Sequence, residues 1–222
     1  MAGLTPGAVG ERLAEVHHRI ERAGGNRREI TIVAVTKDFL LDAVVAALAN
    51  GLQDCGENRA EGIRRKQFAG VSEISKVRWH YLGRVQRNQV RRIAAHVALW
   101  QAVDRVAAGE EIAKRAPGAA VLIQVNVSGE PQKHGATADE VPALAEELAG
   151  LGLDVRGLMA VGPTGPPDAA RPGFRALAAL ADHLDLPVRS MGMTDDLEIA
   201  VQEGSTMLRI GRALFGERPS TT

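Results

Sequence analysis

The apolar run Thr31-Ile32-Val33-Ala34-Val35-Thr36 ends directly at Lys37, and this stretch predicts both the fold and the chemistry of the chain. β-Branched residues dominate the run, which is typical of a buried strand. Only five of the 27 basic residues are lysines, so a lysine at this strand end is unusual in an arginine-rich sequence. Desolvation against apolar neighbours is expected to lower its pKa, which frees the amine for a Schiff base. The alternative is a lysine that only extends from the strand rim into water.

Seven further short apolar runs follow, and stretches with helical periodicity separate them. The expected strands are residues 31–36, 52–55, 77–82, 97–102, 120–127, 155–161, 188–191 and 207–210. The expected helices are residues 7–23, 41–50, 60–68, 86–95, 105–116, 140–151, 169–184 and 195–203. Strands that alternate with helices in this way predict an α/β fold, a single (β/α)8 TIM barrel with an extra N-terminal helix. A doubly wound open sheet is the structural alternative. No linker or low-complexity tract divides the sequence, so residues 1–222 are expected to form one domain.

Composition excludes several classes of protein. The formal net charge is zero and the pI is about 7.0, which predicts neither a nucleic-acid partner nor a membrane-surface partner. A single cysteine, Cys55, excludes an internal disulfide and a cysteine metal cluster, and we expect no metal site. Cys55 itself is expected to be a small buried residue rather than a nucleophile. With no N-terminal apolar segment, the sequence predicts a cytoplasmic protein, and we expect it to be a monomer.

Polar and glycine residues gather where the predicted strands end. In a parallel barrel the C-terminal strand ends carry the chemistry, so these side chains are expected to face one opening. Taken singly, each has an ordinary explanation, such as a turn residue or a hydrogen-bonded core histidine. Taken together they predict a site, and the candidate residues are Lys37, Asn58, His80, Asn126, Met159, Ser190, Met193, Thr194, Arg209, Gly211 and Arg212.

The last two strands carry the features of an anion site. Gly211 directly follows the eighth predicted strand and lets the backbone approach a ligand, while Thr194 offers a hydroxyl after the seventh. Asp195, Asp196 and Glu198 would repel an anion, so we expect them to face outward. A Schiff-base lysine, an anion site and an arginine between them indicate a phosphorylated aldehyde as the ligand.

At these residues the chain resembles the pyridoxal phosphate homeostasis proteins, the YggS/PROSC-type family, whose barrel is similar to the N-terminal domain of alanine racemase. The resemblance covers nearly the whole chain. It rests on the motifs at residues 33–37, 56–59, 79–83, 124–126, 129–135, 157–159, 190–193 and 204–211.

The resemblance implies specific roles for the candidate residues. Lys37 holds pyridoxal 5'-phosphate (PLP) as an internal aldimine, and Arg209 faces the pyridine nitrogen. Thr194, Gly211 and Arg212 cradle the phosphate. Two residues depart from the family pattern, because Arg212 stands where Thr or Ser is common and Gln89 where Lys is common.

Three functions remain open at this stage. Racemisation or transamination works best with a protonated ring nitrogen, which Arg209 does not favour, and a racemase also needs a second acid–base group. The only tyrosine, Tyr81, lies inside the third predicted strand. The leading hypothesis is therefore intracellular PLP homeostasis, with storage or delivery of the cofactor to apo PLP-dependent enzymes and little or no catalysis. The alternatives are a low-activity PLP-dependent amino-acid racemase or lyase, and a Schiff-base aldolase in which Lys37 attacks a phosphorylated ketose.

Overall fold

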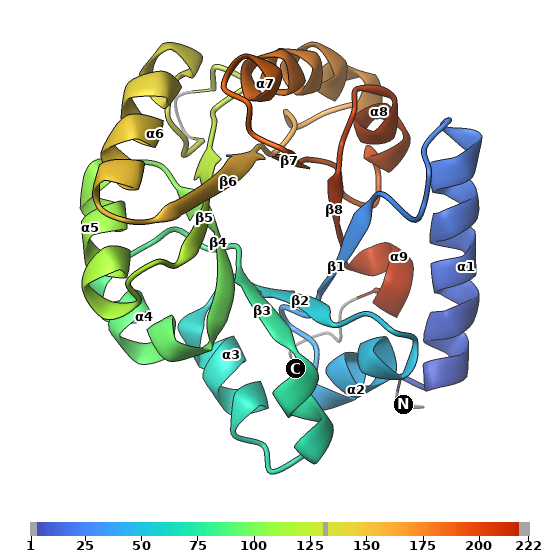
Figure 1. The fold of residues 1–222 in the computed structure, drawn as a ribbon. Helices are drawn as coiled ribbons and strands as arrows, with labels where there is room; N and C mark the ends of the chain where they lie inside the picture. Colours follow the sequence, from blue (N-terminus) through green and yellow to red (C-terminus); the bar gives the residue numbers. More distant parts are fainter. Residues whose placement is uncertain (1–3, 131–132, 218–222) are drawn as a thin grey trace.

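The computed structural model describes residues 4–130 and 133–217, which form a closed parallel barrel whose strands follow one another in chain order (Figure 1). The strands are β1 (Thr31–Val35), β2 (Asp54–Glu57), β3 (Arg78–Tyr81), β4 (Val97–Val103), β5 (Ala120–Gln124), β6 (Asp154–Met159), β7 (Val188–Ser190) and β8 (Met207–Ile210). Strand β1 closes the ring because it pairs with both β2 and β8. The predicted (β/α)8 barrel is confirmed, and the open sheet is excluded.

Helices surround the barrel on its outside (Figure 1). They are α1 (Pro6–Arg22), α2 (Leu41–Ala49), α3 (Ala60–Gln67), α4 (Arg87–Ile93), α5 (Val106–Arg115), α6 (Val141–Gly150), α7 (Arg171–His183), α8 (Leu197–Gln202) and α9 (Arg212–Phe215). Short 3₁₀ helices are η1 (Ser72–Lys76), η2 (Ala94–His96), η3 (Ala138–Glu140) and η4 (Pro167–Ala170). All the predicted helices are confirmed; α1 lies one residue earlier than expected and the others are shorter, whereas α9 was not expected.

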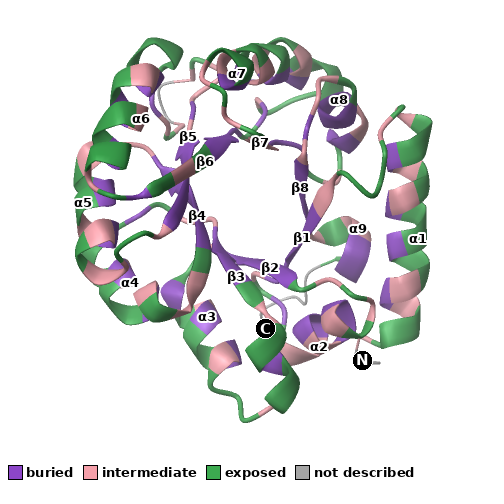
Figure 2. Ribbon diagram, viewed as in Figure 1, coloured by how far each residue is buried: buried purple, intermediate pink, exposed green. Residues whose placement is uncertain are grey.

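The extra N-terminal helix α1 forms for reasons that are visible in its sequence. The Thr5 hydroxyl accepts a hydrogen bond from the backbone N–H of Ala8, and Pro6 occupies the first turn, where it costs no hydrogen bond. Its buried side chains lie on one stripe and are Val9, Leu13, Val16 and Ile20. This stripe packs against α2, α8 and α9, and Figure 2 shows buried residues on the inward side of the surrounding helices.

The barrel interior is filled by side chains rather than open. A buried inner cluster contains Val33, Leu99, Leu122, Met159 and Met207, each from a different strand. Alternate residues of the strands point outward to the helices, so the strands are buried on both sides (Figure 2). One site residue predicted from the sequence, Met159, is therefore part of the packed interior.

One strand, β2, begins two residues later than the apolar pattern predicts. The pattern ends at Cys55, but Gly56 and Glu57 continue the strand and pair with His80 and Tyr81 of β3. A glutamate is expected at the surface from sequence alone. The Glu57 side chain is nevertheless only 3% exposed, and it forms an ion pair with the equally buried Lys66. The sequence offers no periodicity that would reveal this pairing.

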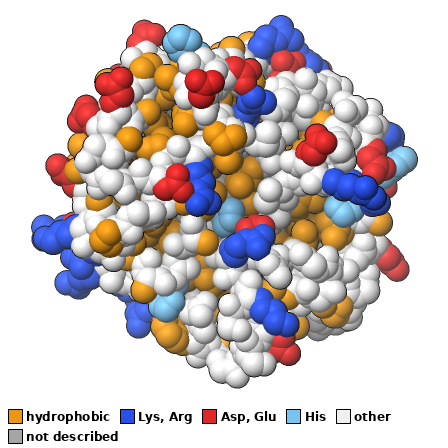
Figure 3. Space-filling view, in the orientation of Figure 1, with side chains coloured by type: hydrophobic (Ala, Val, Ile, Leu, Met, Phe, Trp, Pro, Cys, Tyr) orange, Lys and Arg blue, Asp and Glu red, His pale blue; other side chains and the backbone are white. Residues whose placement is uncertain are grey.

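Charged side chains of both signs are scattered over the visible face of the molecule (Figure 3). Among the described helices, none has both the length and the apolar character that crossing a bilayer requires. Cys55 is buried, and burial raises the pKa of its thiol to about 12, so it is a poor nucleophile at neutral pH.

Candidate functional site

Lys37 lies in the first turn after β1 and lines a cavity of about 390 Å³. This volume is within the range usual for small-molecule sites. Gly211 and Arg212, which follow β8, line the same cavity. The structure therefore brings together the predicted lysine and two of the three residues predicted for the anion site.

Behind Lys37 lies a buried polar group of three residues. The Lys66 ammonium forms an ion pair with Glu57, and both side chains are at most 3% exposed. Lys66 also donates a 2.7 Å hydrogen bond to the carbonyl of Thr36, and the Thr36 hydroxyl donates a 2.8 Å bond to Glu57. This Thr36–Glu57–Lys66 group holds the backbone just before Lys37 and satisfies its own buried charges.

Arg209 lies on β8 inside the barrel and is 5% exposed. Its guanidinium donates 2.7 Å hydrogen bonds to the carbonyls of Ser190 and Ala160, and a 2.8 Å bond to the Ser190 hydroxyl. Burial lowers its pKa to about 10, while the nearby Asp196 carboxylate raises it, so Arg209 remains a cation at neutral pH. Two of the predicted site residues, Ser190 and Arg209, are thus joined by a direct hydrogen bond.

His80 is part of the interior rather than of the cavity beside Lys37. Its Nε2 lies 3.0 Å from a carboxylate oxygen of Asp54, the first residue of β2. Its Nδ1 lies 2.7 Å from the side-chain nitrogen of Gln101 on β4. His80 connects to Ser190 only through Gln101, a residue that the sequence did not single out because a glutamine in a strand carries no motif.

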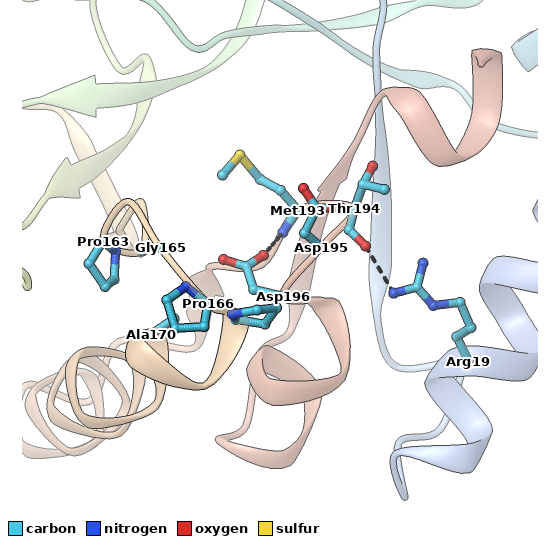
Figure 4. A pocket seen from close by; sticks show the side chains of 11 residues that line it. Arg19, Pro163, Gly165, Pro166, Ala170, Met193, Thr194, Asp195 and Asp196 are labelled. Atoms are coloured by element: carbon cyan, nitrogen blue, oxygen red, sulfur yellow. Dashed lines mark hydrogen bonds between the residues drawn. The ribbon is translucent and has the colours of Figure 1, made fainter. Parts of the chain in front are cut away.

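Met193 and Thr194 line a second cavity, of about 520 Å³, together with Arg19 of α1 and Asp196 (Figure 4). The expectation that Asp196 faces outward is wrong. It is 9% exposed and accepts a 2.6 Å hydrogen bond from the backbone N–H of Met193, which caps this loop (Figure 4). Burial raises the pKa of Asp196, and the hydrogen bond from Met193 opposes that shift.

The carboxylates near Asp196 already have partners. Glu198 pairs with Arg19 at 2.6 Å. Exposed Asp195 pairs with Arg212. The Thr194 hydroxyl accepts a 3.1 Å bond from the backbone N–H of Ala213, so the loop after β7 and the start of α9 are tied together. Thr194 therefore lies beside Arg212 even though it lines the other cavity.

Asn126 and Asn58 organise loops at the strand ends. The Asn126 amide donates to the carbonyls of Glu130 and Lys133, at 3.1 and 3.3 Å, and Lys133 donates a 2.8 Å bond to the carbonyl of Gly162. The Asn58 carbonyl lies so close to Gly83 that a Cβ there would overlap it. The glycine after β3 is thus explained by close backbone packing.

The cavity beside Lys37 is small and has a glycine in its wall. The buried Arg209 stands two residues before that glycine, on β8, and is not among the residues that line the cavity. A Cβ at Gly211 would lie 3.3 Å from the Val35 carbonyl oxygen, and both residues line the cavity, so a larger side chain would crowd this wall. These groups fit an aldehyde-bearing ligand of small size, and PLP has the aldehyde, the ring nitrogen and the anionic group that they would contact.

The fold and site define an alanine-racemase-type barrel with a lysine at the end of its first strand. The family profile of the alanine racemase N-terminal domain matches residues 12–219. The pyridoxal phosphate homeostasis protein of Pseudomonas aeruginosa is 39% identical and covers 95% of this chain and 96% of that protein. The pyridoxal phosphate homeostasis protein of Aquifex aeolicus is 36% identical, and the match covers 94% of this chain and 97% of that protein. The chain belongs to the pyridoxal phosphate homeostasis proteins.

Solved structures agree with this family. PipY of Synechococcus elongatus, in the structure with PLP bound, superposes with a TM-score of 0.80 at 27% identity, covering 94% of this chain and 100% of that one. An alanine racemase of Clostridium difficile has a TM-score of 0.69 at 14% identity and covers 95% of this chain and 58% of that one. The second similarity concerns the fold alone.

Proposed function

We propose that this protein binds PLP through the Lys37 amine, holds it in reserve and passes it to enzymes that require it. The observation that carries the proposal is that Lys37, Gly211 and Arg212 line one cavity of about 390 Å³. The relatives named as PLP homeostasis proteins and the PLP-bound PipY support it. A free aldehyde reacts with many amines, so a carrier that limits its concentration has a clear physical purpose.

Each candidate residue has a proposed task. Lys37 bonds covalently to the aldehyde carbon, and Arg209 donates a hydrogen bond to the ring nitrogen. Gly211, Arg212 and Thr194 hold the phosphate, and Arg212 exchanges its exposed partner Asp195 for it, since a surface ion pair is weak. The remaining predicted residues shape and support the site, and they are Asn58, His80, Asn126, Met159, Ser190 and Met193.

Weak catalysis follows from the same groups. PLP supplies an electron-withdrawing ring, and this ring is most effective when its nitrogen is protonated. A cationic arginine donates a hydrogen bond and has no proton to give near neutral pH. Tyr81 does not supply an acid–base group, because it packs 5.3 Å from Trp100 and burial raises its pKa to about 12.

The proposal also covers the compartment of the protein, its oligomeric state and its partners. We place it in the cytoplasm as a monomer, with apo PLP-dependent enzymes as recipients. The poorly reactive, buried thiol of Cys55 is compatible with a reducing compartment.

A transfer experiment tests the proposal. The PLP-loaded protein is mixed with the apo form of a PLP-dependent enzyme, and recovery of that enzyme's activity is followed while the visible absorption of the loaded protein falls. We expect stoichiometric transfer and no D-amino acid or keto acid when L-alanine or L-serine is added instead. Turnover of about one per second or faster, or failure to load with PLP, would contradict the proposal.

A further inference from the structure

A line of buried polar side chains crosses the barrel interior from β2 to β8. Its members come from five strands and are at most 9% exposed, and they are Asp54, His80, Gln101, Ser190 and Arg209. Such groups are costly inside a barrel unless every one of them is hydrogen-bonded. Water does not solvate these side chains in the barrel interior, so each of them must be satisfied by the other members of the line or by neighbouring protein groups.

The hydrogen bonds all run in one direction. Arg209 donates to the Ser190 hydroxyl at 2.8 Å, and that hydroxyl donates to the Gln101 carbonyl oxygen at 2.7 Å. The Gln101 amide then donates to His80 Nδ1 at 2.7 Å. His80 donates through Nε2 to the Asp54 carboxylate at 3.0 Å, since an ionised carboxylate is acceptor-only. Along the line every donor meets an acceptor. Outside it, the Gln101 amide also donates to the Met207 sulfur at 3.2 Å, and the Asp54 carboxylate also accepts from Arg78.

The line has opposite charges at its two ends. Burial opposes ionisation of Asp54, but hydrogen bonds from His80 and Arg78 outweigh it and lower the Asp54 pKa to about 2. At the other end Arg209 is a cation. Dipoles arranged between a cation and an anion polarise one another, so the whole line favours a single orientation of each side chain.

Arg209 keeps donors available while it is held. It makes three hydrogen bonds to protein acceptors, so at least two of its five N–H groups are not committed to them. The Ser190 hydroxyl, fixed by Gln101, and two carbonyls set the plane of the guanidinium. A different rotamer of Ser190 or Gln101 would leave Arg209 held by the carbonyls alone.

We propose that Asp54, His80, Gln101 and Ser190 are positioning residues that orient the Arg209 guanidinium toward the ring nitrogen of bound PLP. This inference rests on the proposed PLP binding. On this proposal His80, which lies in the motif at residues 79–83, acts on the cofactor only through Gln101, Ser190 and Arg209. Asp54, at the amino-terminal end of β2, then contributes to cofactor binding as well.

The first experiment needs no cofactor. The protein is labelled with ¹⁵N-arginine, and the Arg209 Nη–H signals, which belong to the nitrogens that donate to Ser190 and Ala160, are identified by their loss in Arg209→Lys. Ser190→Ala and Gln101→Met should speed exchange of the Nη protons with water at least tenfold. The matched control is Ser205→Ala, because Ser205 is a buried serine like Ser190, with 4% exposure, and its hydroxyl donates to the Met191 carbonyl at 2.7 Å outside the line. An unchanged exchange rate in both line variants overturns the inference.

The second experiment uses PLP labelled with ¹⁵N in its ring. In wild-type protein the ring-nitrogen shift should differ from that of the unbound cofactor, and Arg209→Lys should alter it. Ser190→Ala and Gln101→Met should move the shift in the same direction as Arg209→Lys, whereas Ser205→Ala should not. A loss of thermal stability without any change of shift would show a structural role only and would overturn the inference.

The two failures are distinguishable. Should wild-type protein not bind PLP, the proposed function fails, and the exchange measurement still decides whether the line holds Arg209. Should PLP bind and only Arg209→Lys change the ring shift, the carrier proposal stands and the positioning role of the line is wrong.

Discussion

The Lys66 ammonium donates a 2.7 Å hydrogen bond to the backbone carbonyl of Thr36, the residue directly before Lys37. Lys66 is buried and paired with Glu57, so its amine is engaged in the fold. A buried cation of this kind keeps the end of β1 in place. It also leaves Lys66 a poor competitor for an aldehyde, although it lies near the site.

Removing Lys66 should destabilise the fold strongly. Lys66→Met leaves the Glu57 carboxylate buried with the Thr36 hydroxyl but without a cation, which costs roughly 3–5 kcal/mol. The free energy of unfolding in urea measures the loss. Lys114→Met, at an exposed position of α5, is the control and should change stability by less than about 0.5 kcal/mol. Equal effects of the two substitutions would show that the buried pair has no special importance.

The helix α3 contains Gly62 because the Glu57 side chain occupies the space of a Cβ. A Cβ at this position would overlap the Glu57 carboxylate. In most helices Gly→Ala stabilises by up to about 1 kcal/mol, but Gly62→Ala should instead destabilise by about 1–3 kcal/mol. Gly7→Ala in α1 is the matched control, since nothing lies within 4 Å of its Cβ. A stabilised Gly62→Ala protein would contradict the packing seen around Glu57.

Acid should reveal the charge of Asp54. Hydrogen bonds from His80 and Arg78 lower its pKa from 3.8 to about 2 against the effect of burial. Because the folded-state pKa is below the unfolded-state value, this stabilisation is complete above about pH 4 and disappears as the pH falls toward 2. We expect Asp54→Asn to cost about 1–2 kcal/mol at pH 6 and progressively less below pH 4. Urea unfolding at pH 6, 4 and 3 checks this, and a cost that is independent of pH would contradict it.

A side chain at Gly211 should discriminate between phosphorylated and unphosphorylated ligands. Gly211→Val places a bulky side chain in the wall of the cavity that Lys37 also lines, and it pushes the backbone away from the phosphate. The affinity for PLP should therefore fall at least tenfold more than the affinity for pyridoxal. Affinities are measured by absorbance titration. Gly150→Val, at an open position on α6, serves as the control. Equal losses for PLP and pyridoxal would place the phosphate elsewhere.

The sequence predicts the barrel because buried parallel strands leave an unmistakable pattern, and every predicted strand is present. It also predicts the cluster of Lys37, Gly211 and Arg212, since strand ends converge at one opening. It does not reveal the partners that fill the interior. Glu57 lies just after a predicted strand and Lys66 lies nine residues further on in a predicted helix, so the pattern itself does not pair them, and Gln101 resembles any strand residue. Their roles depend on side-chain direction across the barrel, which spacing along the chain does not encode. The burial of Asp196 was not predicted either, because an acidic residue at the start of a helix usually faces solvent.

Reduction with borohydride followed by peptide mass spectrometry tests the central claim most directly. Protein loaded with PLP is reduced, digested and mapped. We expect one pyridoxyl group per chain, on Lys37, and loss of the visible band and of trapping in Lys37→Ala, with the fold retained because a half-buried lysine beyond the strand carries little of the core. A pyridoxyl group found mainly on Lys66, Lys76, Lys114 or Lys133 would contradict the account.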